Sequence, residues 1–443
     1  MSSVAPIERM ARLSTLITDT TKILTDFLAA KGIDAHSLSV DDLADFPVSP
    51  VDSKPFKART EIIEATWELH DIALGPRESL RALAWGLSLQ AIWEFKIAEA
   101  VPTSGSITFD ELAAKIRERT GKGILPFKLR ILLRHAMTSR VFCEPQKGQV
   151  AHIQMSRLLA TNPKSKARVG FLTGDLFPAF ANAVNAVKRW PGSQESNETG
   201  VNIAYDQSLP FYNFIQLDEG RAMRYSRAIE SHGSSEGTEI SHGVVDGYPW
   251  GELVDATVVD MGGNMGYVSV AIVQAFPKLK FVVQDTEGMR SADALASVPQ
   301  SLQNRVELTI HDFFDAQPVV AEAYLFRHVA DAASPWANYI LICVSFTYKY
   351  SITILQSLVP ALRKGAKIII NDAMLPEPGK SSYLSERTIR MLDVVMLTVT
   401  NSRERELDDW RDLFRIADPR YKFMRAWKPT KSQLWFIEAE WDP

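Results

Sequence analysis

Short apolar runs alternate with helix-like segments from about residue 256 to the C-terminus. Five runs rich in Val, Ile, Leu and Phe predict buried strands, and their alternation with helical segments is typical of a doubly wound sheet. Two further runs, joined by a Pro-Thr-Lys-Ser turn, predict an antiparallel pair at the sheet edge. The seven runs are 257–261, 280–285, 306–310, 323–327, 366–372, 421–427 and 433–441. We therefore predict an α/β fold with a mixed seven-stranded sheet.

The first 245 residues show helical periodicity instead. Apolar side chains recur every three or four positions from Ala5 to Ala30, which predicts an amphipathic helix, and residues 39–57 resemble a linker because Pro and Asp recur there. Three helices followed by a β-hairpin over 141–153 indicate a winged-helix-like arrangement, and residues 168–231 are predicted to be helical around a polar loop. The three helices are predicted over 80–98, 108–119 and 125–138.

These changes in pattern divide the chain into three parts. We expect an N-terminal helix and linker over 1–57, a helical winged-helix-like dimerisation and substrate domain over 58–245, and a cofactor-binding domain over 246–443. The helix over 125–138 has a largely apolar surface and few basic side chains, so DNA binding is not expected.

Composition narrows the class of partner. The net charge is −4 and no basic run occurs, which argues against nucleic acid or an anionic membrane surface as the main partner. No apolar stretch is long enough to span a bilayer. The two cysteines, Cys143 and Cys343, form neither a disulfide framework nor a metal motif, so we expect no metal and a reducing, cytoplasmic location. A small-molecule substrate is the better expectation.

The first predicted strand runs into a glycine loop that opens a helix, the context in which a backbone approaches a nucleotide closely. The loop glycines are Gly262, Gly263 and Gly266. Asp285 ends the second strand, where it is placed to accept hydrogen bonds from two ribose hydroxyls. Asp312 follows the third strand, where it is placed to meet an adenine amino group, with Phe313 beside the ring. Three such elements at successive strand ends predict a bound adenosine.

The loop distinguishes two adenosine cofactors. NAD is the main rival, but the spacing here is GGxxG rather than GxGxxG. Asp260 precedes the loop, where a carboxylate suits the amino group of a methionine moiety and would repel a pyrophosphate. We therefore predict S-adenosyl-L-methionine as the cofactor.

The run VVDMGGNMGYVSVAIVQAFPKLKFVVQD, residues 258–285, resembles the cofactor motif of plant-type, caffeate-like O-methyltransferases, particularly their fungal secondary-metabolism branch. The resemblance covers most of the chain from about Leu80, including residues 246–250, 360–365, 372–376 and 401–405. It implies a Rossmann-like methyltransferase domain and a homodimer formed through the N-terminal half. It also implies a substrate pocket between the helical and Rossmann-like domains.

The resemblance also implies a set of catalytic positions. Arg327 takes the family's basic position, which we group with the cofactor-binding residues, whereas Asp372 and Glu404 take the positions of two carboxylates that orient a catalytic histidine. The histidine position itself is occupied by Asp331, and no histidine occurs after His328. His328 remains a candidate base, and a structural role beside the cofactor is the alternative.

The segment after this position is also unusual. Residues 329–348 are about a dozen residues longer than the connection needs. A genuine insertion, an intron retained in the gene model and a site that has abandoned its base all explain this length. The last account has a concrete form, because some fungal members of the family bind the cofactor but catalyse dehydrations and pericyclic reactions. Candidate hydrogen-bond donors for that chemistry are His135, His232, Thr238, His242 and Lys349.

The leading prediction is an O-methyltransferase that acts on a hydroxyl of a polyketide, pyridone or other aromatic secondary metabolite. A pericyclase or dehydratase of the same fold is the alternative, and a non-catalytic, cofactor-binding partner is a third class. Four arginines in the C-terminal part are expected to be solvated or paired surface charges. These are Arg387, Arg390, Arg403 and Arg405.

Overall fold

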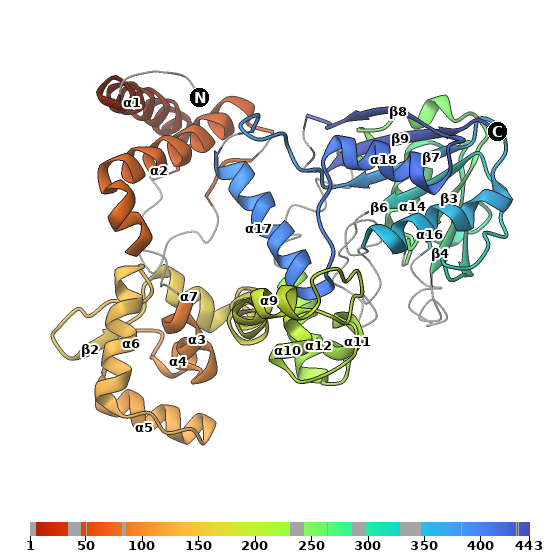
Figure 1. The fold of residues 1–443 in the computed structure, drawn as a ribbon. Coiled ribbons are helices and arrows are strands. Elements are labelled where there is room, and N and C mark those ends of the chain that lie inside the picture. Colours follow the sequence, from red (N-terminus) through yellow and green to blue (C-terminus); the bar gives the residue numbers. More distant parts are fainter. Residues whose placement is uncertain are drawn as a thin grey trace. The chain divides into compact units, whose positions relative to one another are not determined.

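The structure is a computed structural model whose described residues form two compact units (Figure 1). One unit comprises 1–175 with 382–384, and the other comprises 176–381 with 385–443. The helices between 177 and 230 therefore group with the sheet, whereas the domain boundary at 245–246 stays a prediction. The structure describes residues 6–33, 46–49, 51–81, 86–230, 243–263, 265–285, 298–327, 347–381, 383–430, 432 and 434–443.

The first unit is helical and carries a small two-stranded sheet. Its helices are α1 (Pro6–Ala30), α2 (Ser53–Arg81), α3 (Gly86–Glu94), α4 (Ile97–Ala100), α5 (Phe109–Thr120), α6 (Pro126–Thr138), α7 (Gln154–Thr161) and α8 (Pro163–Gly170). Local signals set some of these boundaries: Thr108 and Glu111 form a capping box that starts α5, and Gly121, at φ 68°, ends it. The predicted helices over 5–30, 108–119 and 125–138 are confirmed within one or two residues.

The predicted hairpin over 141–153 is only partly correct. Strand β2 (Gln149–Ala151) pairs mainly with β1 (Ser106–Thr108), which precedes α5, whereas Cys143 forms one isolated bridge to Ala151. The partner strand is three residues long and contains one apolar side chain, Ile107, so it offers no alternation to detect. The strand that pairs with β2 is therefore short and lies about 40 residues earlier in the sequence.

The second unit is built on the seven-stranded sheet, which confirms the predicted α/β class. The strands are β3 (Thr257–Met261), β4 (Lys280–Asp285), β5 (Val306–Ile310), β6 (Ala323–Arg327), β7 (Lys367–Asp372), β8 (Tyr421–Trp427) and β9 (Trp435–Trp441). Their order is β5-β4-β3-β6-β7-β9-β8, with the first five parallel and β9 antiparallel to both neighbours. The chain reverses its direction of travel across the sheet between β3 and β6, which is where such sheets bind ligands.

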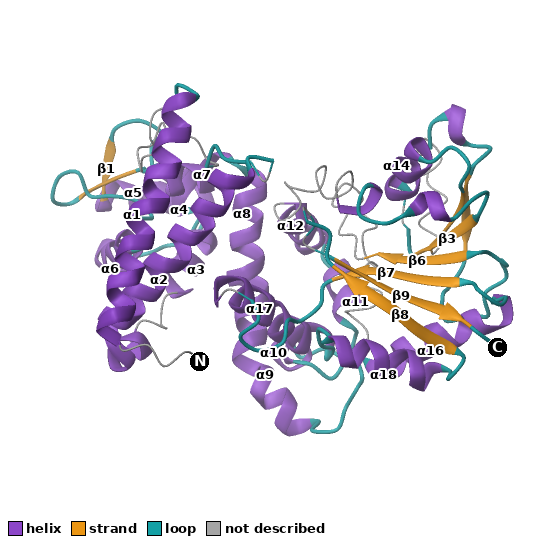
Figure 2. Cartoon of the chain, turned by 90° about the horizontal axis from the view of Figure 1, so that it is seen from above, coloured by secondary structure: helices purple, strands orange, loops and turns teal. Residues whose placement is uncertain are grey.

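Both faces of this sheet are buried, which explains its continuous apolar strands. Along β6, Tyr324 and Phe326 belong to one core cluster while Ala323 and Leu325 belong to the other, because successive side chains point to opposite faces. The Tyr324 face packs on α16 (Tyr348–Leu358) and α18 (Leu407–Ala417), and the Leu325 face packs on α14 (Tyr267–Ala275). Figure 2 shows these helices on opposite sides of the strands.

The same unit contains the helices that precede the sheet in sequence and a long helix between β7 and β8. The former are α9 (Phe177–Arg189), α10 (Gly200–Ala204), α11 (Phe211–Gln216) and α12 (Glu219–Glu230); the latter is α17 (Tyr383–Thr400), whose first two residues fall in the other unit. The π-helical turn Phe171–Leu176 belongs to the first unit except for Leu176. A close contact joins α9 and α10, since a Cβ at Gly200 would lie 2.5 Å from the Ala179 carbonyl oxygen. None of the described helices is both long enough and apolar enough to cross a membrane.

Candidate functional site

The candidate cofactor residues lie at adjoining carboxyl ends of three parallel strands. The Gly262 amide donates to the Gln284 carbonyl over 2.7 Å, which ties the glycine loop after β3 to the end of β4. Asp285, the last residue of β4, pairs in register with Ile310 of β5, two residues before Asp312. The structure therefore brings together the loop and both acids that the sequence predicted.

The loop conformation accounts for its glycines. Gly262 and Gly266 have φ values of 70° and 73°, in the left-handed region that side chains disfavour. At Gly263 a Cβ would lie 2.6 Å from the Asp260 carboxyl carbon and 2.7 Å from a Val283 methyl carbon. The chain thus turns tightly from β3 into α14, whose first-turn N–H groups suit a polar ligand.

Asp260 supports this loop from inside the protein. Its side chain is buried, and one carboxylate oxygen accepts a 2.5 Å hydrogen bond from the Ser269 hydroxyl on α14. Burial raises the pKa of Asp260 to about 6, against the opposing effects of Ser269 and the positive charge of Arg327. Sequence reasoning missed Ser269, although its hydroxyl interrupts an otherwise apolar stretch of α14. The contact of Asp260 with a methionine amino group stays a prediction.

Asp312 and Phe313 form an ordered turn after β5. One Asp312 carboxylate oxygen accepts a 2.9 Å hydrogen bond from the Phe314 amide, and the Ser357 hydroxyl on α16 donates to the Phe313 carbonyl over 2.7 Å. Phe313 is only 5% exposed and packs in the core, with its ring centroid 4.9 Å from that of Phe314. Helix α16 therefore supports the turn on which the predicted adenine contacts lie.

The two predicted catalytic carboxyl groups are both buried. Asp372 ends β7, where one of its oxygens accepts a 2.7 Å hydrogen bond from the next amide, and Glu404 lies in the turn after α17. The Leu375 amide donates to the Arg405 carbonyl over 2.8 Å, which holds the two segments together. The Asp393 carboxylate in turn accepts a 2.8 Å hydrogen bond from the Glu404 amide.

Burial favours the protonated form of both carboxyl groups. It raises the pKa of Asp372 to about 7, although Arg405 and Arg327 oppose the shift. Burial, together with the negative charges of Asp372 and Asp393, raises the pKa of Glu404 to about 9. The Oε2 atom of Glu404 is buried without a hydrogen-bond partner among the described residues. Such an orphaned oxygen fits a site that a ligand completes.

Arg327 occupies a central position in this charge arrangement. It ends β6 and is buried, and its Nε donates a 3.1 Å hydrogen bond to the Asn371 side chain. Its positive charge lowers the pKa of Asp260, which supports the glycine loop, and of Asp372, which belongs to the buried carboxyl pair. Arg327 therefore favours the ionised form of both groups.

The prediction that Arg405 is a surface charge is wrong. The side chain is 1% exposed, its guanidinium donates a 2.8 Å hydrogen bond to the Ser351 hydroxyl, and it lies over the Trp410 ring at 5.1 Å. The amphipathic helix α18 buries Trp410 and covers the guanidinium with it. By contrast, the expected ion pairs form at two of the other arginines. Arg390 pairs with Glu386 and Glu406, and Arg403 pairs with Asp409.

Several predicted positions lie outside the described residues or away from the strand ends. The positions outside the described residues are His232, Thr238, His242, His328 and Asp331, together with the rest of residues 329–346. His135 is in the first unit, on α6, where its Nδ1 lies 2.8 Å from the Ser88 hydroxyl. Among the described residues, no cluster of His, Cys, Asp and Glu suits a metal ion.

Comparison with known proteins finds methyltransferases. A family profile described as an O-methyltransferase domain matches residues 194–418. The chain is 35% identical over 440 residues to the grayanic acid biosynthesis cluster O-methyltransferase of Cladonia grayi, covering 99% of this chain and 89% of that protein. It is 36% identical over 445 residues to the chlorophenol O-methyltransferase of Trichoderma longibrachiatum, covering 98% and 90%.

Solved structures with the same fold have less similar sequences. OxaC in complex with SAH and oxaline has a TM-score of 0.66 at 19% identity and covers 99% of this chain and 100% of its own. A pericyclic reaction enzyme has a TM-score of 0.63 at 19% identity and covers 87% and 94%. At these identities the likeness concerns the fold.

Proposed function

The chain belongs to the O-methyltransferase domain family, and from this premise we propose that it methylates a hydroxyl of a polyketide, pyridone or other aromatic secondary metabolite. Members of this family use S-adenosyl-L-methionine. A chlorophenol O-methyltransferase among the relatives supports a phenolic hydroxyl as the acceptor.

One observation carries the proposal: the glycine loop, Asp285 and Asp312 lie on adjoining carboxyl ends of β3, β4 and β5. In our proposal the loop backbone contacts the cofactor, Asp285 accepts hydrogen bonds from its ribose, and Asp312 meets its adenine amino group, with Phe313 beside the ring. Asp260 supports the loop and faces the methionine amino group. Arg327 acts through Asp260 and Asp372, because a guanidinium directly against a sulfonium cation would be repelled.

When bound, S-adenosyl-L-methionine supplies an electrophilic methyl group on a positively charged sulfur. The protein then has to align the acceptor hydroxyl and receive its proton. We propose that Asp372 and Glu404 border the reacting centre. A positive charge beside a carboxyl group lowers its pKa, so a larger fraction of Glu404 is ionised, and therefore able to accept a proton, at a loaded site. His328 remains a candidate for the base itself.

A second function of the same fold is a pericyclase or dehydratase. The observation that favours it is Asp331, which stands where the family has its catalytic histidine. A protonated Glu404, whose pKa is raised to about 9, is suited to this chemistry, because a neutral carboxyl group donates a hydrogen bond to a substrate carbonyl.

One experiment separates these functions. The purified protein is incubated with methyl-labelled S-adenosyl-L-methionine and a panel of phenols and hydroxypyridones, and both label transfer and isomerised product are measured. Label in a product establishes the methyltransferase. Conversion that requires the cofactor but leaves it unconsumed establishes the pericyclase or dehydratase. A bound cofactor with neither result would indicate the non-catalytic partner.

We also propose that the protein is a cytoplasmic homodimer. The family resemblance of the N-terminal half supports the dimer, and helix α1 exposes 38% of both Met10 and Leu16. The low cysteine content supports a reducing compartment. Light scattering on the purified chain tests the dimer, and a mass of about 50 kDa, that of a single 49.5 kDa chain, would contradict it.

A further inference from the structure

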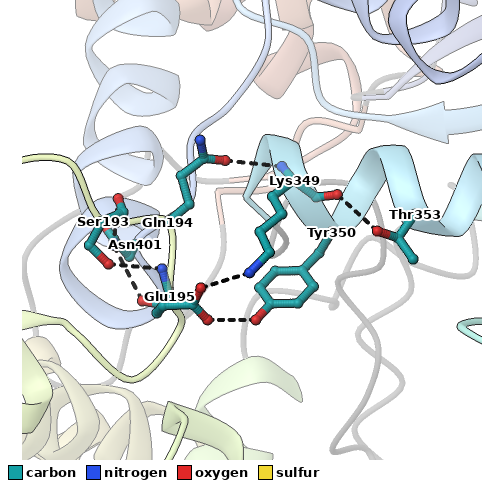
Figure 3. A network of polar contacts seen from close by, with 7 residues as sticks. All are labelled: Ser193, Gln194, Glu195, Lys349, Tyr350, Thr353 and Asn401. Atoms are coloured by element: carbon teal, nitrogen blue, oxygen red, sulfur yellow. Dashed lines mark hydrogen bonds and ion pairs between the residues drawn. The ribbon is translucent and has the colours of Figure 1, made fainter.

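A polar network joins the loop between α9 and α10 to two other segments of the same unit (Figure 3). One Glu195 carboxylate oxygen contacts Lys349 Nζ at 2.8 Å, and the other accepts a 2.6 Å hydrogen bond from the Tyr350 hydroxyl. The neighbouring Gln194 side chain accepts a 3.0 Å hydrogen bond from the Lys349 amide. Two consecutive loop residues thus hold the first turn of α16.

The loop is anchored independently on its other side. The Asn401 side chain donates to the carbonyls of Ser193 and Glu195, over 3.1 and 3.3 Å. Asn401 has a left-handed φ of 56°, which Asn tolerates better than most residues, and it directly follows α17. The contacts with Asn401 therefore fix the loop at Glu195 independently of its contacts with α16.

Helix α16 carries this contact to the predicted adenine side of the site. The Tyr350 ring meets the Phe314 ring edge to face, with centroids 6.0 Å apart, and Phe314 donates its amide to Asp312. About two turns further along, the Ser357 hydroxyl donates to the Phe313 carbonyl, and the Ser357 carbonyl accepts a 2.9 Å hydrogen bond from the Gln317 amide. Both the first and the last turn of α16 thus support the segment 312–317.

We propose that Glu195 is a positioning residue for the cofactor: by holding Tyr350 and the first turn of α16, it fixes the turn that carries Asp312 and Phe313. This inference rests on the proposed S-adenosyl-L-methionine site. Glu195 acts through Tyr350.

The exposure of the network separates positioning from overall stability. The side chains of Lys349 and Glu195 are 56% and 41% exposed, so their ion pair adds little to global stability. The hydrogen bond from Lys349, followed by that from Tyr350, lowers the pKa of Glu195, which therefore accepts as a charged group near neutral pH. Removing the Glu195 carboxylate should therefore loosen the first turn of α16 without unfolding the sheet.

The test measures binding of S-adenosylhomocysteine by calorimetry, together with the thermal unfolding midpoint and KM and kcat for any acceptor found. The variants are Glu195→Gln, Tyr350→Phe and the double variant. Glu198→Gln is the matched control, since it makes the same change in the same loop and the Glu198 side chain has no polar partner within the described part of the chain.

We expect each single variant to weaken binding about tenfold. The double variant should bind about as weakly as Glu195→Gln alone, because that substitution already replaces the charged acceptor of the Tyr350 hydroxyl. Unfolding midpoints should stay within about 2 °C of the wild type. KM for S-adenosyl-L-methionine should rise while kcat at saturation is retained.

Three results would overturn the inference. Wild-type affinity in both single variants would show that the contact positions nothing. A loss of binding that Glu198→Gln shares, or that accompanies a midpoint lowered by more than about 5 °C, would show a general structural effect. Failure of the wild-type protein to bind S-adenosylhomocysteine would refute the proposed function and the inference with it.

Discussion

Glu404→Gln should change how the stability of the protein depends on pH. Glu404 is 2% exposed with its pKa raised to about 9, whereas an unfolded glutamate has a pKa of about 4.3. A carboxyl group whose pKa is raised on folding contributes stability that is complete below the unfolded value and is lost as the pH rises toward the folded value. Between about pH 5 and 9 the wild-type protein should therefore lose about 1.4 kcal/mol per pH unit at this residue.

Glutamine resembles the neutral acid in shape and does not titrate, so the variant should lack this slope. From pH 6 to pH 8 the stability difference between the two proteins should change by about 2.7 kcal/mol in favour of the variant. Asp372 and Asp260 titrate in both proteins, with pKa values of about 7 and 6, so the difference between the two stability curves, rather than either curve alone, reports on Glu404.

The assay is urea unfolding at pH 6, 7 and 8, with Glu198→Gln as the control for the loss of a carboxylate at a partly exposed position. The control should follow the wild-type slope. Parallel stability curves for wild type and Glu404→Gln across this range would refute the reasoning, because Glu404 would then be charged in the folded protein.

Three further outcomes follow from the structure. Gly263→Ala should lower stability by about 1–3 kcal/mol and weaken S-adenosylhomocysteine binding, because the added Cβ would lie 2.6 Å from the Asp260 side chain. The control is Gly192→Ala, where the Cβ meets open space, and it should change stability by less than about 0.5 kcal/mol in the same unfolding experiment. Asp285→Asn should raise the calorimetric Kd for S-adenosylhomocysteine about tenfold or more through the lost charge-assisted hydrogen bonds, and an unchanged Kd would remove Asp285 from the ribose site. Burial lowers the pKa of His152, so the folded state favours the neutral imidazole and loses stability as the pH falls below about 6.5. In His152→Gln the free energy of unfolding should therefore depend less on pH between about 6.5 and 5. An unchanged pH dependence would contradict a buried neutral imidazole.

Much of the sheet and of the cofactor loop could be predicted from local patterns. All seven strands are found within one or two residues of their predicted limits, since each buried strand carries a continuous or alternating apolar run of its own. The glycines of the loop were equally visible, because a left-handed turn between a strand and a helix restricts the residue types allowed there. The order of the strand ends then followed from the doubly wound topology.

Other properties exist only once distant segments meet. The β1 partner of the wing, the burial of Arg405 under Trp410 and the contact of Glu195 with Tyr350 each join residues whose separation leaves no periodic signal. The raised pKa values of Asp372 and Glu404 likewise arise from burial, and for Glu404 also from the negative charges of Asp372 and Asp393, against the opposing charge of Arg405. Residue type and spacing therefore determine which elements form and which acids stand at strand ends. Only tertiary packing decides the charge those acids carry, because desolvation and neighbouring charges depend on the whole fold.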